Sequence, residues 1–225
     1  MSKTQQKIAI ITGASHPQDI GTAICRRLAG DGVNIFFTHW HADLNWIGEF
    51  KQEILSKGVS CEEMSIDLSQ SQSPKTILQT VDEKLGVPSI LINNAAHSAQ
   101  DGYLALDAQT LDDHYAVNMR STLLLCVEFA RLFEKANFIS GRIINMTSGQ
   151  ELGPMMGELA YVATKGAISA FTRSLAQELA PLGITVNAVN PGPTDSTWMN
   201  DAIRGYLLPK FPMGGGLGHQ RMWPN

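Results

Sequence analysis

The sequence predicts an α/β protein whose core is a doubly wound parallel sheet. Short β-branched runs alternate with longer segments of helical period, which is typical of a parallel sheet with helices on both faces. The polar and glycine-containing segments follow the predicted strands, where ligands bind in such sheets. No linker rich in Gly, Ser or Pro and no internal repeat divides the 225 residues. We therefore expect a single domain.

Six strands are predicted in order along the chain. Their runs read KIAIIT, VNIFFT, EEMSI, SILIN, GRIINMT and ITVNAVN, near residues 7–12, 33–38, 62–66, 89–93, 141–147 and 184–190. The segments between them have helical period and predict helices near 20–30, 43–57, 74–85, 111–136 and 159–181. Asn190, Pro191 and Gly192 form a loop signal after the sixth strand, and one more short helix is expected near 199–208.

The composition is that of an ordinary globular protein. Hydrophobic residues make up 44% and charged residues 17% of the chain, which excludes disordered, collagen-like and coiled-coil classes. Seventeen Lys and Arg stand against twenty-one Asp and Glu, and the net charge of -4 does not suit a phosphate backbone. We therefore expect no nucleic acid partner.

The cysteines and the N-terminus indicate the compartment. Cys25, Cys61 and Cys126 are odd in number, widely spaced and set among apolar residues, which is typical of buried thiols in a reducing environment. The polar N-terminus reaches Ile8 too soon for a signal peptide, and no apolar run has the length of a membrane span. We expect a cytoplasmic protein with no membrane partner.

A loop with two glycines follows the first strand. It runs from Thr12 and Gly13 to Gly21, where the next helix begins. Glycines at such a turn let the backbone approach a pyrophosphate, whose charge then lies at the helix N-terminus. A tight turn without a ligand would use the same residues, so the loop alone does not decide between these two interpretations.

Later segments identify the family that the chain resembles. Asn93, Asn94, Ala95 and Ala96 follow the fourth strand, Asn118 lies in the next helix, and Ser148 follows the fifth strand; Tyr161 and Lys165 open the helix after that, and Pro191 and Gly192 follow the sixth strand. In this order and spacing, the segments resemble the short-chain dehydrogenase/reductase family, in particular its oxoacyl-carrier-protein-reductase-like and sugar-dehydrogenase-like members. The resemblance implies a Rossmann-like fold and an NAD(P)-dependent oxidoreductase.

The resemblance also implies where a nicotinamide dinucleotide would bind. The expected contacts are Gly13, Ser15, Ile20, Gly21, Thr38, His39, Asp67, Asn94, Ala95, Lys165, Pro191, Gly192, Thr194 and Ser196. The glycine loop departs from the family pattern, because it is two residues longer and has Asp19 where the middle glycine is expected. Either Asp19 points to solvent as a helix cap or the phosphates are held differently, and we favour the cap.

The choice between NAD and NADP depends on the end of the second strand. A carboxylate there would select NAD, but none occurs before Asp43. Thr38, His39 and His16 are able to hydrogen-bond a phosphate, so the sequence favours NADP, with NAD possible. Asp67 matches the family's residue at the adenine amino group, and an N-cap of the next helix is the alternative.

Tyr161 and Lys165 are the expected catalytic pair. They lie four residues apart on one helix face, and an ammonium near the phenol would lower its pKa from about 10. The resemblance implies that Lys165 also holds the nicotinamide ribose, that Ser148 binds the substrate carbonyl oxygen, and that Asn118 holds a proton-relay water. Tyr161 would then exchange a proton with a carbonyl or secondary alcohol substrate. Singly, each of these residues also has an ordinary structural interpretation.

The substrate side is less specific. The mixed polar and apolar loop residues expected to border the pocket are His97, Gln150, Glu151, Met155, Met156 and Trp198. No His, Cys or carboxylate cluster suggests a metal. The apolar surface of helix 159–181, with the family's usual pairing, predicts a homodimer or homotetramer of the full-length form. Two alternatives to an active enzyme are a nucleotide-sensing protein of the same fold and a truncated, inactive enzyme.

The C-terminal tail departs from the family. The resemblance ends near Met213, so we expect a family domain over 1–213 and an aberrant tail over 214–225. Met222 and Trp223 have one codon each, and in a shifted frame they give Val and Ala, as relatives have at this point. The sequence therefore predicts a frameshift near Gly214–Gly215 and the loss of the family's last strand and helix.

Overall fold

A six-stranded parallel sheet forms the centre of the protein. The computed structural model describes residues 6–194, 196 and 205. The strands are β1 (Ile8–Ile11), β2 (Asn34–His39), β3 (Cys61–Ser65), β4 (Ile90–Asn93), β5 (Gly141–Met146) and β6 (Ile184–Val189). Their order across the sheet is β3-β2-β1-β4-β5-β6, and every neighbouring pair is parallel. This is the strand order of the Rossmann fold.

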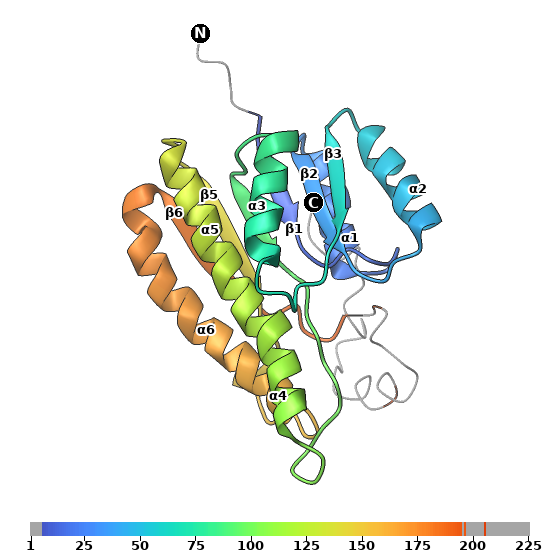
Figure 1. Ribbon diagram of the computed structural model, residues 1–225, viewed down its shortest axis with the longest axis vertical. Helices are drawn as coiled ribbons and strands as arrows, with labels where there is room; N and C mark the ends of the chain where they lie inside the picture. The colour runs from blue at the N-terminus through green and yellow to red at the C-terminus, as the bar shows by residue number, and fades with distance from the viewer. Residues whose placement is uncertain (1–5, 195, 197–204, 206–225) are drawn as a thin grey trace.

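Helices cover both faces of this sheet (Figure 1). They are α1 (Ile20–Gly30), α2 (Leu44–Leu55), α3 (Ser73–Lys84), α4 (Ala108–His114), α5 (Thr122–Lys135) and α6 (Leu159–Leu179). Successive strand residues point to opposite faces, so Phe36 packs in the cluster with α3, α5 and α6, whereas Phe37 packs in the cluster with α1 and α2. The two apolar clusters make this a three-layer, single-domain α/β fold.

The sequence-based elements are largely confirmed. Each predicted strand agrees with the structure within one residue at both ends, and four of the five helices agree within two. The helix predicted over 111–136 was wrong in detail, because it begins at Ala108 and comprises α4, a π-helical segment η1 (Tyr115–Ser121) and α5. Short 3₁₀ segments at Gly149–Glu151 and Ala180–Leu182 complete the described elements.

Several predictions concern residues outside this description. Apart from Gly205, the short helix expected near 199–208 lies outside the described residues, as does the tail over 214–225. The frameshift therefore stays a prediction. The three cysteines, Cys25, Cys61 and Cys126, are free and buried, as expected. Within the described residues, no helix combines the length and the apolar character needed to span a membrane.

The fold has one point at which the chain reverses its direction across the sheet. From β1 the chain proceeds through α1 to β2 on one side, whereas β4 pairs with β1 on the other side and leads toward β5. The segments that follow β1 and β4 therefore diverge and leave a crevice at the carboxyl ends of the strands. In doubly wound sheets this crevice is where ligands bind.

Candidate active site

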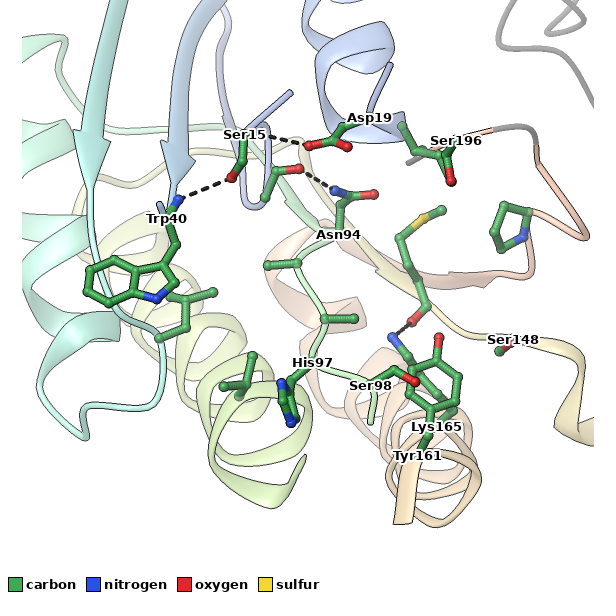
Figure 2. Close-up of a pocket in the computed structure, with 18 of the residues that line it drawn as sticks. Ser15, Asp19, Trp40, Asn94, His97, Ser98, Ser148, Tyr161, Lys165 and Ser196 are labelled. Carbon is green, nitrogen blue, oxygen red and sulfur yellow. Dashed lines mark hydrogen bonds between the residues drawn. The ribbon is translucent and has the colours of Figure 1, made fainter. Parts of the chain in front are cut away.

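A cavity of about 790 Å³ opens at this reversal point (Figure 2). Segments that follow all six strands line it, together with the first two turns of α6. Seventeen of the predicted site residues are found in its wall: Gly13, Ser15, Ile20, Thr38, His39, Asp67, Asn94, Ala95, Ser148, Tyr161, Lys165, Pro191, Gly192, Thr194, Ser196 and, from the substrate side, His97 and Met155. Gly21 and Asn118 are not among the residues that line it.

The glycine loop packs tightly against the segment after β4. Asn94 donates from its side-chain nitrogen to the backbone oxygens of Thr12 and Gly13, both at 2.9 Å. Gly13 has a φ of +76°, and a Cβ there would lie 2.7 Å from Cα of Ala95. At Gly21 a Cβ would lie 2.4 Å from the Gly13 oxygen. The two glycines therefore serve the close approach of loop, helix and strand.

We predict that Gly21→Ala lowers the free energy of unfolding by about 1–3 kcal/mol, because the added methyl group overlaps backbone atoms. Gly30→Ala is the matched control, since it lies in the same helix and its Cβ would meet nothing within 4 Å. The control should be unchanged or more stable by up to about 1 kcal/mol. Urea unfolding of both variants measures this, and equal stability of the two would contradict the packing argument.

Asp19 stands at the start of α1, as expected, and the alternative that the phosphates are held differently stays a prediction. It is the N-cap residue of α1, but its side chain makes no capping hydrogen bond to the helix. Instead its Oδ2 accepts hydrogen bonds from the backbone N–H groups of Ser15 at 3.0 Å and His16 at 2.9 Å. The predicted N-cap position is therefore confirmed, but the carboxylate is directed at two backbone donors of the loop and not at the helix.

The end of β2 contributes two of the expected phosphate ligands to the cavity wall, where their contact with a phosphate stays a prediction. Thr38 and His39 are only 2% and 3% exposed. The His39 Nε2 atom lies 2.9 Å from the carboxylate of Glu63 on β3, so this ring is paired within the protein. The backbone oxygen of Thr38 accepts from the N–H groups of Gly13 and Ala14. These residues border the cavity mainly as its floor, because strand pairing directs their side chains into the protein.

Asp67 closes a turn after β3. Its carboxylate accepts from the backbone and hydroxyl of Ser69, both at 2.8 Å, and from Gln70 at 3.1 Å. Burial alone would raise the pKa of Asp67, but these hydrogen bonds outweigh it and lower the pKa. The alternative of an N-cap for the next helix was wrong, since α3 begins at Ser73 and has Gln72 as its N-cap. Asp67 lies in the cavity wall as an ionised side chain.

Asn118 occupies the π-helical segment η1 and is fully buried. Its Oδ1 accepts from the N–H of His97 at 2.7 Å, and its Nδ2 donates to the His97 oxygen at 2.8 Å and the Thr164 hydroxyl at 3.1 Å. This side chain therefore joins the loop after β4 to α6. Its place in a π-helical segment is in keeping with the frequent occurrence of such segments at functional sites.

The helix α6 brings Tyr161 and Lys165 to the cavity together. Lys165 is 2% exposed, and its Nζ donates to the backbone oxygen of Met146 at 2.8 Å. Burial lowers the pKa of Lys165 from 10.5 to about 8. The same ammonium lies 5.5 Å from the centre of the Tyr161 ring. Figure 2 shows both side chains near Ser148 at the same end of the cavity.

The phenol of Tyr161 does not have the lowered pKa that the sequence predicted. Burial raises the pKa, a hydrogen bond with Ser148 opposes this, and the negative charge of Glu158 adds to the rise. Burial is the largest of these causes, and the Lys165 ammonium donates to the Met146 oxygen. In this arrangement Tyr161 keeps its proton at neutral pH.

The start of α6 is fixed by residues that sequence reasoning missed. Asp101, in the loop after β4, accepts from the N–H groups of Leu159 at 2.7 Å and Ala160 at 2.8 Å. Glu158, one helical turn before Tyr161, lines the cavity, and burial together with Asp101 raises its pKa. No sequence signal links Asp101 to this helix, because 58 residues separate it from Leu159.

The substrate end contains only part of the expected set. His97 and Met155 line the cavity, whereas Met156 is 93% exposed. Gln150 and Glu151 are also outside the wall, and Gln150 instead accepts from the Ser148 N–H at 3.0 Å. Trp198 lies outside the described residues. Burial and the neighbouring His114 lower the pKa of His97, so its ring is neutral at pH 7.

The cavity residues fit a dinucleotide better than a metal ion. Within the part of the chain that the structure describes, no group of three or more His, Cys, Asp or Glu is placed to hold a metal. The cavity extends without interruption from the Gly13 loop and the N-terminus of α1 to Tyr161 on α6. Pro191, Gly192 and Thr194 close it after β6. At one end of the cavity, the N–H groups at the start of α1 are available to bind a phosphate. At the other end, Tyr161 and Lys165 form an acid–base pair.

Comparisons with known proteins agree with this geometry. The "Uncharacterized oxidoreductase YjdA" of Bacillus subtilis (strain 168) is 72% identical over 214 residues, which are 95% of this chain and 85% of the relative. The 3-oxoacyl-[acyl-carrier-protein] reductase FabG of Pseudomonas aeruginosa is 33% identical and is matched over 93% of this chain and 84% of its own.

A solved structure and a protein family also match this chain. The blue fluorescent protein from a metagenomic library, in complex with NADPH, superposes with a TM-score of 0.84 at 28% identity, over 96% of this chain and 86% of that one. Residues 7–206 match the short chain dehydrogenase family. The chain therefore belongs to the short-chain dehydrogenase/reductase family.

Proposed function

We propose that this chain transfers a hydride between a nicotinamide dinucleotide and a carbonyl compound or secondary alcohol, with Tyr161 as the general acid and base. The observation that carries the proposal is that Tyr161, Lys165 and Ser148 border the same cavity as the glycine loop. When bound, the nicotinamide supplies or accepts the hydride. The protein supplies orientation and the proton.

Each side chain has a definite part in this proposal. Ser148 donates a hydrogen bond to the carbonyl oxygen of the substrate, and Tyr161 gives that oxygen its proton during reduction. The raised pKa of Tyr161 suits a proton donor at neutral pH. Lys165 holds the nicotinamide ribose hydroxyls with its ammonium. Asn118 positions the His97 loop against α6, and the relay water expected at Asn118 remains a proposal.

Several finer features are proposals as well. NADP is favoured because β2 ends without a carboxylate of its own, and a structural relative is in complex with NADPH. A homodimer or homotetramer and a cytoplasmic location are expected from the family resemblance and the apolar face of α6. We propose a small carbonyl compound or alcohol as the substrate class, because the cavity wall contains both polar and apolar residues.

The proposal is tested by binding and turnover with this 225-residue protein. Titration with NADPH and NADH, followed by fluorescence, measures binding, and a panel of ketones, aldehydes and acyl-thioester ketones measures turnover at 340 nm. We expect saturable binding of at least one cofactor and reduction of at least one carbonyl class. Binding without turnover would favour a nucleotide-sensing protein, and no binding would contradict the proposal.

A further inference from the structure

We propose that Glu158 is a specificity residue whose carboxylate binds a protonated amine of the substrate. The substrate class is then a ketone, or the corresponding secondary alcohol, with an ammonium group a few bonds from the reacting carbon. The inference rests on the proposed function, because it takes Tyr161 to act on a carbonyl oxygen in the same cavity. It adds a feature of the substrate that the carbonyl contacts of Tyr161 and Ser148 do not select.

Glu158 lies at the catalytic end of the cavity. It lines the wall together with Tyr161 and Lys165, and it is the N-cap residue of α6, three residues before Tyr161. Residues three apart at a helix are neighbours. The negative charge of Glu158 adds to the rise in the pKa of Tyr161, so the two groups are within electrostatic reach of each other. A substrate whose carbonyl oxygen contacts Tyr161 therefore lies close to this carboxylate.

Another residue caps α6 in place of Glu158. The Asp101 carboxylate accepts from the backbone N–H groups of Leu159 at 2.7 Å and Ala160 at 2.8 Å. The Asp101 N–H donates to the backbone oxygen of Gly157 at 2.8 Å. Glu158 lies between these contacts, and its own side chain makes no capping hydrogen bond. Its backbone is thus fixed from both sides, while its carboxylate is available to a ligand in the cavity.

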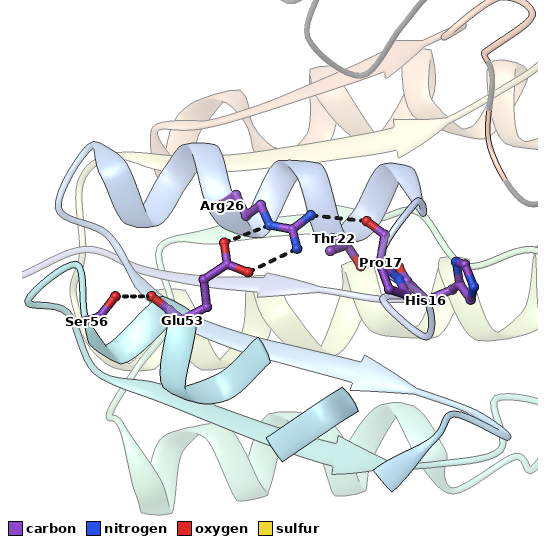
Figure 3. Close-up of polar contacts among 6 residues, drawn as sticks. All are labelled: His16, Pro17, Thr22, Arg26, Glu53 and Ser56. Atoms are coloured by element: carbon purple, nitrogen blue, oxygen red, sulfur yellow. Dashed lines mark hydrogen bonds and ion pairs between the residues drawn. The ribbon is translucent and has the colours of Figure 1, made fainter. Parts of the chain in front are cut away.

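The other half-buried glutamates of the described residues each have a basic partner. Glu53 on α2 accepts from Arg26 with both carboxylate oxygens, at 2.8 and 3.0 Å (Figure 3). The further pairs are Glu62 with Lys51, Glu63 with His39 and Glu128 with Arg131. Within the described residues Glu158 forms no such pair, and no hydrogen bond contributes to the shift of its pKa. Because a half-buried carboxylate without a partner is unfavourable, a cation in the cavity would be stabilised there.

A second carboxylate adds to the negative charge at this position. Burial alone would raise the pKa of Asp101, but the N–H groups of Ala160 and Leu159 outweigh it and lower the pKa. Asp101 is therefore ionised at neutral pH. Burial, and after it the charge of Asp101, raise the pKa of Glu158. A cation bound by Glu158 would relieve the repulsion between these two carboxylates.

The basic groups nearby do not neutralise this charge. The His114 Nε2 atom accepts from the N–H of Ala99 at 3.1 Å, and Nδ1 lies 2.7 Å from the Thr110 oxygen, which is the arrangement of a neutral ring. Among the described wall residues Lys165 is the one lysine, and there is no arginine. The Lys165 ammonium donates to the Met146 oxygen. The missing positive charge is thus left for the substrate to supply.

The cation that fits this end of the cavity is organic. No group of three or more His, Cys, Asp or Glu in the described part of the chain is placed to hold a metal ion. Met155 lines the wall with its sulfur 3.9 Å from the Ser148 hydroxyl oxygen, so an apolar surface lies beside the expected position of the carbonyl. A hydrocarbon chain along Met155 would join a carbonyl oxygen at Tyr161 to an ammonium group at Glu158.

The test compares two ketones of the same shape that differ in charge. The amine of 5-(dimethylamino)pentan-2-one is protonated at pH 7, since alkylamines have pKa values of about 10, and 6-methylheptan-2-one has CH in place of the nitrogen. Reduction rates give the ratio of kcat/KM for the two ketones. Calorimetry with saturating oxidised cofactor, which does not reduce a ketone, gives the ratio of their Kd values without turnover.

Glu158→Gln removes the charge and keeps the size of the side chain, and Glu158→Ala is a second uncharged variant. Both are expected to fold, because Asp101 and not Glu158 caps α6. Glu178→Gln is the matched control, since it makes the same change on an exposed residue at the other end of this helix. Thermal melting verifies that each variant is folded.

We expect the wild type and Glu178→Gln to favour the dimethylamino ketone in both ratios, and the two Glu158 variants to lower this preference by about tenfold or more. An unchanged preference in the folded Glu158 variants would overturn the inference. A wild type that binds and reduces both ketones equally well, or neither of them, would also overturn it. Failure of the proposed function is distinguishable, since it appears as absent cofactor binding or absent turnover of the whole carbonyl panel.

Discussion

Replacing Tyr161 by Phe is expected to lower kcat by about 10²–10⁴-fold while leaving the Kd for the cofactor within about twofold, because it removes only the proton donor. The phenol is the acidic group that the structure brings to the Ser148 end of the cavity, and burial keeps it protonated. Phe keeps the ring and its packing. Steady-state reduction rates and fluorescence titration measure the two quantities separately.

Tyr103→Phe is the control for the loss of a phenol. Tyr103 is 86% exposed and is not one of the residues that line the cavity, so kcat should not change. Retention of more than about a tenth of wild-type kcat in Tyr161→Phe would show that another group donates the proton. A large rise in the cofactor Kd would instead assign Tyr161 to binding.

Replacing Lys165 by Met is expected to impair both binding and turnover. Loss of a charged hydrogen-bond donor to the ribose should raise the cofactor Kd by about tenfold or more, and kcat/KM should fall by about 100-fold or more. Met is apolar and similar in length, so it fits the buried site that Lys165 occupies. Lys75→Met, an exposed change on α3, is the control for loss of a surface charge.

The lowered pKa of Lys165 predicts how the free energy of unfolding depends on pH. Its pKa is about 8 in the folded protein and 10.5 ordinarily, so the unfolded chain binds more protons between these values. The free energy of unfolding is therefore at its full value, as far as this group is concerned, above pH 10.5. It decreases by about 3 kcal/mol as the pH falls to about 8. The stability advantage of Lys165→Met over the wild type should shrink from pH 8 to pH 10.5 in denaturant titrations.

Results for the two variants are interpreted together. A loss of turnover in Lys165→Met with an unchanged cofactor Kd would contradict the ribose contact and leave Lys165 as an electrostatic partner of Tyr161. An identical pH dependence of stability in Lys165→Met and the wild type would contradict the lowered pKa of the buried ammonium.

The fold and the residues that line the cavity could largely be predicted from the sequence. Alternating strand and helix periods predicted β1 to β6 within one residue, because local propensity and burial of strands on both faces act along the chain. The spacing of Tyr161 and Lys165 placed them on one helix face, since four residues make about one turn. Residues that follow strands had to meet at one edge of the sheet, because parallel strands end there together.

The pairing of the polar side chains could not be predicted from the sequence. Asp19 accepts from backbone N–H groups of the loop, His39 is paired with Glu63 from the neighbouring strand, and Asn118 joins two distant segments from a π-helical segment. Each contact depends on which donors a neighbouring segment brings within hydrogen-bond distance. The local sequence does not show which segment packs beside a residue. The same residue type therefore caps a helix, binds a ligand or joins two segments, depending on its neighbours.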